Sequence, residues 1–346
     1  MSHAVSVVDS DIRFACEPGE SLLDAAERAG FEMPYSCRKG VCGNCRGKIE
    51  SGQLASLGAA PGLTELERES GYVLYCRSTP VCDVAIRPLE IKPVDKSLRK
   101  RIKAKVYRIE RVADDVTLLR LRFPAGVRAK FRAGQYLQVI LEDGQRREFS
   151  MANAPAISDE AHLHVRHVQG GHFTGSVLPG LQTGQTLELE LPFGDFFLRE
   201  ESQAPIVFIA TGTGFAPVAA MIEDMWKRKV ERPFVLYWGA RTARHLYAMD
   251  TVHKWRTAHP ALQFVPVLSE APEGEPGVRR GLVHEAVLED FPSLAGAQVY
   301  ACGSPAMTRA ARETFVALGG LRVENFFCDA FVSGPAEAQT LTGAIG

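Results

Sequence analysis

Residues 37–45 read Cys37-Arg38-Lys39-Gly40-Val41-Cys42-Gly43-Asn44-Cys45. The three cysteines follow the pattern C-x4-C-x2-C, and a fourth cysteine, Cys76, stands later in the chain. Four thiolates at this spacing can hold two irons and two bridging sulfides. Gly40, Gly43 and Gly47 lack a Cβ, which lets the backbone wrap closely around an inorganic core and direct amide groups at its sulfurs. The sequence therefore predicts an electron carrier whose 2Fe-2S cluster is held by Cys37, Cys42, Cys45 and Cys76.

A structural zinc site and a disulfide framework are the alternative uses of these cysteines. Structural zinc sites use two short C-x2-C pairs or a mixture with His, whereas this chain has one C-x2-C pair and none around Cys76. A chain of 346 residues can bury a large core without disulfides. The spacing favours the cluster, and the other cysteines are expected by default to be small buried hydrophobes: Cys16, Cys82, Cys302 and Cys328.

Composition limits the class of protein. With 346 residues, 46% hydrophobic and 23% charged, the chain is expected to form two or three soluble globular domains. A formal net charge of -1 argues against a general nucleic-acid binder. The first eleven residues show no signal-peptide pattern, and no stretch approaches the roughly 18 apolar residues of a membrane helix. We expect a cytoplasmic protein that binds neither nucleic acid nor membrane.

The first domain is predicted over residues 1–92. Alternating stretches at 4–8 and 12–16 predict two strands, and Ser21 is a candidate N-cap for a helix that ends at Gly30. Residues 48–50 and 83–86 can complete the sheet, with Cys76 on the connection between them. This order resembles the β-grasp fold of ferredoxins. From residue 88 to residue 105 the composition shifts, with Pro88 and Pro93 followed by a run of Lys and Arg, which predicts a solvated interdomain linker over residues 93–103.

The second domain is predicted over residues 104–202. Short alternating strands are expected at 116–122, 136–141, 146–150, 163–168 and 186–191. Short strands separated by Gly and Pro favour an antiparallel barrel.

A flavin site is suggested by Arg147-Glu148-Phe149-Ser150, which resembles the R-x-Y-S motif of the ferredoxin-NADP reductase superfamily. The resemblance implies that Arg147 pairs with the FAD pyrophosphate, that Phe149 packs on the flavin in place of the usual tyrosine, and that Ser150 lies near flavin N5. The resemblance extends to two further stretches expected to flank FAD, namely His164, Val165 and Arg166 on a strand, and Gly171, Phe173 and Thr174 at a turn.

The third domain is predicted over residues 203–346. Apolar strands at 206–210, 234–238, 263–268 and 299–302 alternate with helices, including one at 218–229, which predicts a parallel sheet covered on both faces. Gly212, Thr213 and Gly214 directly follow the first strand, where close backbone approach to a dinucleotide pyrophosphate is expected. The fold class is thus multidomain α+β and α/β: a β-grasp, an antiparallel FAD-binding barrel and a parallel nucleotide-binding domain.

The end of this domain carries the residues expected to act at the reacting centre. Cys302-Gly303-Ser304-Pro305-Ala306-Met307 matches the C-G-x-P-x-M motif of the same superfamily, which implies that Cys302, Gly303 and Pro305 meet the nicotinamide. Asp329 and Phe331 resemble an acidic-x-aromatic terminus whose ring covers the flavin. With Ser150 and Cys302, these two residues form the expected catalytic set. A packing role is the alternative for Cys302.

The nucleotide donor stays open at this point. After the second strand of the domain stand Arg241 and Arg244, with no acid between residues 239 and 245. An acid there favours NADH and a basic pocket favours NADPH. Arg241 is expected to contact the nucleotide, and the family resemblance favours NADH.

The domain order resembles the reductase components of multicomponent aromatic-ring-hydroxylating dioxygenases over nearly the whole chain. The resemblance implies an NAD(P)H-dependent flavin and iron–sulfur oxidoreductase that passes single electrons to an oxygenase, of Rieske type, or to an intermediate ferredoxin. It implies terephthalate as the oxygenase substrate. Alternatives are a reductase of a di-iron monooxygenase, a reductase of a deoxysugar-pathway dehydrase and a non-enzymatic iron–sulfur sensor. Arg38, Lys39 and Arg46 flank the cluster and are expected to dock an acidic partner surface.

Overall fold

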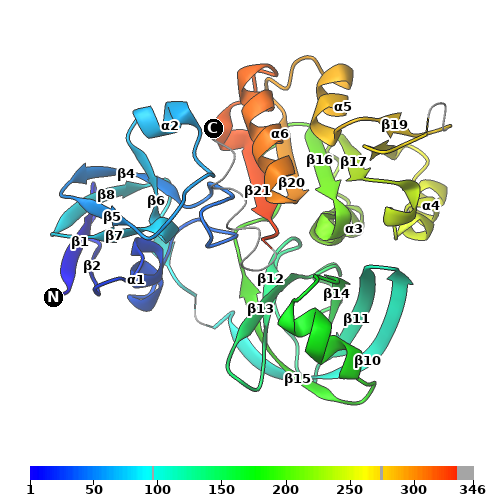
Figure 1. The fold of residues 1–346 in the computed structure, drawn as a ribbon, viewed down its shortest axis with the longest axis horizontal. Coiled ribbons are helices and arrows are strands. Elements are labelled where there is room, and N and C mark those ends of the chain that lie inside the picture. Colours follow the sequence, from blue (N-terminus) through cyan, green and yellow to red (C-terminus); the bar gives the residue numbers. More distant parts are fainter. Residues whose placement is uncertain (96, 273–275, 333–346) are drawn as a thin grey trace. The chain divides into compact units, whose positions relative to one another are not determined.

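A computed structural model describes residues 1–95, 97–272 and 276–332. The chain divides into two compact units, whose described parts are residues 1–95 and 97–332 (Figure 1). Each unit has its own sheets and its own buried core.

The first unit is built around a mixed sheet and contains two α-helices among its described residues. Its five-stranded sheet has the order β2-β1-β8-β4-β6, and its strands are β1 (His3–Val7), β2 (Arg13–Cys16), β4 (Arg46–Ser51), β6 (Tyr72–Leu74) and β8 (Val84–Pro88). β1 pairs in parallel with β8, and the other neighbours are antiparallel. The elements outside this sheet are α1 (Leu22–Arg28), β3 (Phe31–Glu32), β5 (Leu54–Ser56), α2 (Glu65–Glu69), η1 (Tyr75–Arg77), β7 (Ser78–Pro80) and β9 (Lys92–Pro93).

Local sequence determines the start of α1. Ser21 is its N-cap and accepts a hydrogen bond from the Asp24 amide at 3.1 Å. This satisfies one of the backbone donors that a helix start leaves open. Leu22, Leu23 and Ala26 are buried, so the apolar residues of α1 face the interior. The predicted β-grasp is confirmed.

The second unit begins with an antiparallel barrel of six strands: β10 (Lys100–Ala113), β11 (Val116–Arg122), β12 (Tyr136–Ile140), β13 (Arg146–Ser150), β14 (Glu160–Arg166) and β15 (Thr186–Phe193). Their order is β13-β12-β15-β10-β11-β14, and a bridge between Met151 and Leu163 joins the two outer strands. Alternate residues such as Ala161, Leu163 and Val165 fill the interior. The single turns η2 (Phe173–Val177) and η3 (Leu178–Gly180) follow β14.

The predicted linker over residues 93–103 is too long at its C-terminal end. β10 already begins at Lys100 and pairs with β15 from Lys100–Leu191 onward. In this stretch Ile102, Ala104 and Val106 are buried, whereas the basic residues between them are exposed. The basic residues lie on the outer face of a strand. A run of Lys and Arg is also typical of a linker, which is why the sequence alone assigned these residues to one.

The rest of the second unit is a parallel sheet with the order β19-β18-β17-β16-β20-β21. Its strands are β16 (Ile206–Thr211), β17 (Phe234–Ala240), β18 (Gln263–Leu268), β19 (Arg279–Arg280), β20 (Gln298–Gly303) and β21 (Phe326–Ala330). The helices are α3 (Phe215–Lys227), α4 (Met249–Ala258), α5 (Val283–Asp290) and α6 (Pro305–Ala317), with short turns η4 (Gly212–Gly214), η5 (Ala243–His245) and η6 (Val323–Asn325). Figure 1 shows α5 and α6 on one face of the sheet and α3 and α4 on the other. The predicted two-sided parallel sheet is confirmed.

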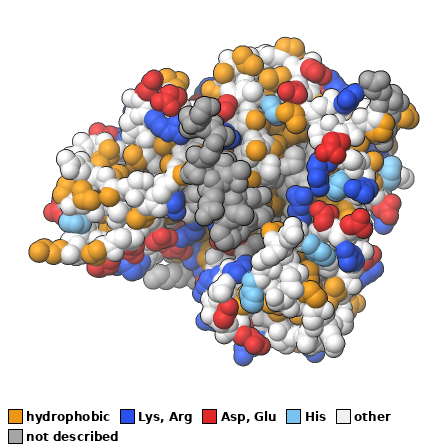
Figure 2. Space-filling model, viewed as in Figure 1, with side chains coloured by type: hydrophobic (Ala, Val, Ile, Leu, Met, Phe, Trp, Pro, Cys, Tyr) orange, Lys and Arg blue, Asp and Glu red, His pale blue; other side chains and the backbone are white. Residues whose placement is uncertain are grey.

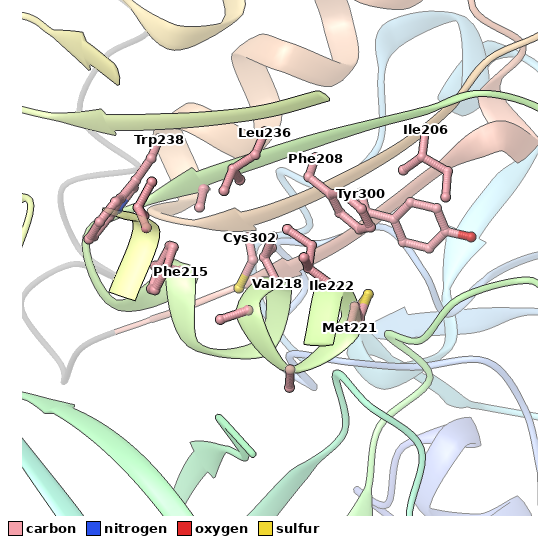
Figure 3. Packing of buried hydrophobic residues seen from close by; sticks show 14 of the residues in the cluster. Ile206, Phe208, Phe215, Val218, Met221, Ile222, Leu236, Trp238, Tyr300 and Cys302 are labelled. Atoms are coloured by element: carbon pink, nitrogen blue, oxygen red, sulfur yellow. The ribbon is translucent and has the colours of Figure 1, made fainter. Parts of the chain in front are cut away.

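The core of this sheet lies between its strands and α3. Figure 3 shows Phe208, Leu236 and Tyr300 from three neighbouring strands pointing toward Val218 and Ile222 of α3. All five side chains are fully buried. Strands buried on both faces require continuous apolar sequence, which is the pattern the chain shows at 206–210. The order of the strands reverses between β16 and β20, and such a reversal is where these sheets bind ligands.

The surface of the described residues is of mixed charge. On the face drawn in Figure 2, basic and acidic side chains are interspersed with apolar ones. No helix among the described residues is long and apolar enough to cross a membrane.

Candidate functional site

The four predicted cluster cysteines are buried in the first unit. Cys37, Cys42, Cys45 and Cys76 are 3–7% exposed, and none forms a disulfide. They lie in two pairs: the Cys42 thiol and burial raise the pKa of Cys37, and the Cys76 thiol and burial raise the pKa of Cys45. Among the described residues, no three His, Cys, Asp or Glu side chains gather around one point as a single metal ion requires. Two pairs of thiols fit a cluster in which each of two irons takes two protein ligands.

The loop between Cys37 and Cys42 supplies amide donors to sulfur. The backbone N–H groups of Lys39, Val41 and Cys42 donate to Cys37 Sγ at 3.4, 3.4 and 3.3 Å. A thiolate that binds iron is stabilised by such donors, which also tune the potential of a cluster. The residues present therefore fit a 2Fe-2S cluster.

Close packing requires glycine in this loop. Gly40 and Gly43 both have φ of +78°, a conformation that favours glycine. A Cβ on Gly62 would lie 2.7 Å from the Gly43 nitrogen, so the neighbouring segment also approaches the loop too closely for any side chain. The geometry explains why glycines accompany the cysteines in sequence.

The predicted basic docking surface is wrong for two of its three residues. Arg38 forms ion pairs with Asp24 and Glu27, and its guanidinium lies over the Tyr35 ring. Arg46 is 9% exposed and pairs with Glu67 at 3.2 Å. Their charges are used within the domain because the acids of α1 and α2 fold back on the cluster loop. Of the three, Lys39 alone is exposed.

Ser150 is the most informative residue of the predicted flavin site. It is 7% exposed at the end of β13, and its Oγ is buried with no hydrogen-bond partner in the structure. An unsatisfied buried hydroxyl costs about 1–3 kcal/mol. A hydroxyl retained in such a position fits a ligand atom that accepts or donates a hydrogen bond there.

The other predicted flavin residues lie on elements next to Ser150. The Phe149 ring packs on the Phe173 ring with 5.0 Å between centroids, and the Met151–Leu163 bridge brings the end of β13 beside β14. Val165 is fully buried and supports β14 from the barrel interior. At the following turn, the Val168 amide donates to Thr174 Oγ1 at 3.1 Å. A Cβ on Gly171 would lie 2.8 Å from that same oxygen.

The two arginines of this site are half-buried or exposed, and each has a local partner. Arg147 donates to Gln145 Oε1 at 2.5 Å and to the Arg146 carbonyl at 3.0 Å. Arg166 forms an ion pair with Asp115 at 3.2 Å. Its guanidinium also lies close to Gly212, since a Cβ added to that glycine would be 3.4 Å from Arg166 Nη1. Arg147 has no acidic partner in the described part of the chain, so its positive charge is available for a phosphate.

The two predicted nucleotide turns contact each other at the carboxyl ends of β16 and β20. A Cβ on Gly214 would lie 2.1 Å from the Cys302 carbonyl oxygen, and one on Gly303 would lie 2.0 Å from Thr211 Oγ1. Thr211 Oγ1 also accepts a hydrogen bond from the Ser304 amide at 3.3 Å. Thr213, in the first of these turns, is buried, and Pro305 begins α6. These contacts bring Gly212, Gly214 and Gly303 together at the strand-order reversal.

Cys302 and Asp329 lie opposite each other on neighbouring strands. β20 and β21 pair in parallel in the register Cys302–Asp329 and Gly303–Ala330. Cys302 is fully buried in the apolar core (Figure 3), and burial together with Asp329 raises the pKa of its thiol. Its side chain is therefore a neutral thiol. Phe331 follows directly, and its amide donates to the Gly303 carbonyl at 2.8 Å.

Arg241 lies at the carboxyl end of β17, as expected. Its carbonyl accepts a hydrogen bond from the Glu270 amide at 2.9 Å, and its side chain is exposed. Neither Arg241 nor Arg244 forms an ion pair with the described residues. Thr242 and His245 close the turn between them through a 2.8 Å hydrogen bond.

Tyr247 was missed by the sequence interpretation. Its hydroxyl is 2.8 Å from His164 Nδ1, so it joins the barrel to the nucleotide-binding sheet. His164 also stacks on Phe215, the first residue of α3. Burial lowers the pKa of His164 to about 3, so its ring is neutral in this contact. A tyrosine in a loop carries no periodic signal, and only the folded chain reveals its partner.

Family models match all three parts of the chain. The model of the 2Fe-2S iron-sulfur cluster binding domain matches residues 5–81, that of the oxidoreductase FAD-binding domain matches 103–198, and that of the oxidoreductase NAD-binding domain matches 208–313. The chain is 43% identical over 335 residues to terephthalate 1,2-dioxygenase, reductase component 2, from Comamonas sp, which covers 97% of this chain and 99% of the relative.

The chain belongs to the family of iron–sulfur flavoprotein reductase components.

Other relatives are named as reductases of different enzyme systems. The CDP-6-deoxy-L-threo-D-glycero-4-hexulose-3-dehydrase reductase of Yersinia pestis is 38% identical, covering 96% of this reductase and 99% of the relative. The crystal structure of the Amycolatopsis cytochrome P450 reductase GcoB matches with a TM-score of 0.74 and 34% identity, covering 95% and 98% of the two chains. The reductase is thus an NAD(P)H-dependent oxidoreductase with FAD and a 2Fe-2S cluster.

Proposed function

We propose that this reductase passes electrons from NAD(P)H to the oxygenase component of an aromatic-ring dioxygenase whose substrate is terephthalate. The observation that carries the proposal is the 43% identity to the Comamonas terephthalate 1,2-dioxygenase reductase component, over nearly all of both chains. The aromatic ring is bound by the oxygenase, so the substrate assignment rests on this relative. The oxygenase is of Rieske type, and electrons reach it directly or through an intermediate ferredoxin.

Residues of the first unit would hold the cluster. Cys37, Cys42, Cys45 and Cys76 are the ligands, because they are buried in two neighbouring pairs and the loop amides point at Cys37 Sγ. Lys39 is the exposed cation of the cluster loop. It would face an acidic partner, and this steering contact would weaken with salt.

Residues of the second unit would hold FAD at the edge of the barrel. Ser150 offers an unsatisfied hydroxyl, Phe149 and Phe173 offer ring faces, and Arg147 offers a charge for the diphosphate. The backbones of His164, Val165 and Arg166 and the turn at Gly171 and Thr174 complete this wall. When bound, FAD takes up a hydride from the nucleotide and gives up electrons singly.

The nucleotide would bind where the glycine turns meet. Gly212, Thr213 and Gly214 present backbone to the pyrophosphate, and Cys302, Gly303 and Pro305 border the nicotinamide. Cys302 acts by packing as a neutral thiol beside the reacting ring. Asp329 is held opposite Cys302, and Phe331 is anchored at Gly303, which places both beside the same turn. Arg241 lies where the adenosine ribose is expected.

A deoxysugar dehydrase is the second candidate partner, because a dehydrase reductase is 38% identical over 96% of this chain. Reconstitution distinguishes the two. The purified reductase, NAD(P)H and a terephthalate-converting Rieske oxygenase are expected to form the dihydroxylated product, in the presence or absence of an added ferredoxin. Product formation only with the dehydrase and its sugar nucleotide would reject the dioxygenase assignment.

The cellular location is proposed to be the cytoplasm. The supporting observations are that the chain uses NAD(P)H, a cytoplasmic reductant, and that none of its eight cysteines, all within the described residues, forms a disulfide. Recovery of the native protein in a periplasmic or membrane fraction would reject this location.

A further inference from the structure

Arginine follows three of the four proposed cluster ligands. The pairs are Cys37-Arg38, Cys45-Arg46 and Cys76-Arg77. The structure treats the three guanidinium groups differently. Arg38 pairs with two acids and Arg46 pairs with Glu67, so acids of the same unit balance both charges.

Arg77 has no acid to balance it in the described part of the chain. Its one hydrogen bond is from Nη2 to the Leu57 carbonyl at 2.6 Å, which is a neutral acceptor. Its Nε is buried and has no hydrogen-bond partner. A guanidinium stays charged at every physiological pH, so Arg77, the residue that follows Cys76, carries a full positive charge.

Two glycines make room for this side chain. A Cβ on Gly40, inside the ligand loop, would lie 2.7 Å from Arg77 Cγ, and a Cβ on Gly58 would lie 1.9 Å from Arg77 Nη2. The Leu57 amide donates to the Arg77 carbonyl at 2.8 Å and fixes the backbone on the other side. The stem of Arg77 therefore packs on the ligand loop, and its head is held against the segment at 57–58.

We propose that Arg77 raises the reduction potential of the cluster through its unbalanced charge. Reduction adds one electron and makes the cluster more negative by one charge, while the reductant loses that electron. A nearby cation that no acid neutralises stabilises the reduced form more than the oxidised form. Net charge, hydrogen bonds to sulfur and solvent exposure are the factors that set such potentials. Arg77 is a positioning residue in this role, and the inference depends on the ligand set assigned to the four cysteines.

The experiment is a redox titration of the purified full-length protein with mediators, followed by electron paramagnetic resonance of the reduced cluster. Arg77→Gln removes the charge and is expected to lower the ratio of reduced to oxidised cluster about tenfold at a fixed potential, which is 59 mV for a one-electron couple. Arg77→Lys keeps the charge and is expected to stay within threefold of the native ratio.

Two controls separate this effect from general changes of charge. Arg13→Gln removes one exposed cation from β2 of the same unit and is expected to leave the potential unchanged. Arg46→Gln combined with Glu67→Gln removes a balanced pair near the cluster and is expected to shift the potential less than Arg77→Gln. An equal shift in Arg77→Gln and Arg77→Lys, or none in Arg77→Gln, would overturn the proposal.

Failure to assemble is also informative. If Arg77→Gln does not hold a cluster, Arg77→Met, which retains an unbranched stem against Gly40, replaces it. Loss of the cluster from both neutral variants but not from Arg77→Lys would overturn the redox role and make Arg77 a structural residue. Absence of a 2Fe-2S signal from the native protein would instead reject the ligand assignment, so the two failures are distinguishable.

Discussion

Replacement of Ser150 by Ala is expected to change stability and catalysis in opposite directions. Ser150 Oγ is buried, has no hydrogen-bond partner in the protein, and lies where the flavin ring is proposed to bind. In FAD-free protein, Ser150→Ala removes an unsatisfied hydroxyl, so the free energy of unfolding is expected to rise by about 1–3 kcal/mol. With FAD bound, the same change is expected to remove the hydrogen bond that Ser150 is proposed to make to the flavin ring.

The expected kinetic loss follows from the same range of energies. A loss of about 1–3 kcal/mol from the transition state slows hydride transfer by about 5-fold to 160-fold. Stopped-flow reduction of the FAD-loaded protein by NAD(P)H measures this step directly, and urea denaturation of the FAD-free protein measures stability. Because the two readouts have opposite signs, a general loss of folding cannot imitate the expected result.

Ser158→Ala is the matched control in the same barrel, since Ser158 Oγ has a partner in Arg128 at 3.1 Å. It is expected to leave hydride transfer unchanged. If Ser150→Ala reduces as fast as the native protein, the hydroxyl makes no contact that matters in the transition state. If it also fails to stabilise the FAD-free protein, the buried hydroxyl is satisfied by water, and the reasoning is refuted.

Three further changes test the other sites. Cys76→Ser is expected to abolish the visible and paramagnetic signals of the cluster while NAD(P)H still reduces the flavin, and loss of flavin reduction in this variant would speak against separate sites. In the control Cys16→Ser, which changes a buried cysteine outside the ligand set, both the cluster signals and flavin reduction are expected to remain. Arg241→Ala is expected to raise the KM for NADPH about tenfold more than the KM for NADH, because only NADPH carries the 2′-phosphate that Arg241 would contact. Equal changes of the two KM values in steady-state assays would reject a contact between Arg241 and the 2′-phosphate. Burial lowers the pKa of His164 from 6.5 to about 3. Between these pH values His164 binds a proton in the unfolded chain but not in the folded chain, so the free energy of unfolding falls as the pH falls, by at most about 1.4 kcal/mol per pH unit. An unchanged pH slope in denaturation curves of His164→Gln would contradict this.

Much of the fold could be predicted because its signals are local. The capping serine at 21 and the apolar run at 206–210 each act through neighbouring residues, and both elements lie where the sequence indicated. The cluster ligands could be proposed for the same reason, since three of the four cysteines lie within nine residues. Cys76 could be added because the fourth ligand of this pattern stands far away in sequence.

Features that depend on distant contacts were predicted incorrectly or missed. Arg38 and Arg46 were interpreted as a free basic surface, yet acids from α1 and α2 neutralise them. The outward-facing charges at the start of β10 were assigned to a linker, because a run of Lys and Arg is also typical of a solvated linker and the strand's pairing partner β15 lies far away in sequence. Tyr247 contacts His164 across 83 positions of sequence, and no periodicity encodes such a pair.

The central claim is that one chain carries electrons from NAD(P)H through a flavin to the cluster held by Cys37, Cys42, Cys45 and Cys76. Anaerobic titration of the protein loaded with FAD and cluster, first with NADH and then with NADPH, tests it most directly through the visible spectrum. The account predicts that one nucleotide bleaches both the flavin bands and the cluster bands. Bleaching of the flavin with an unchanged cluster, or no bleaching by either nucleotide, would contradict it.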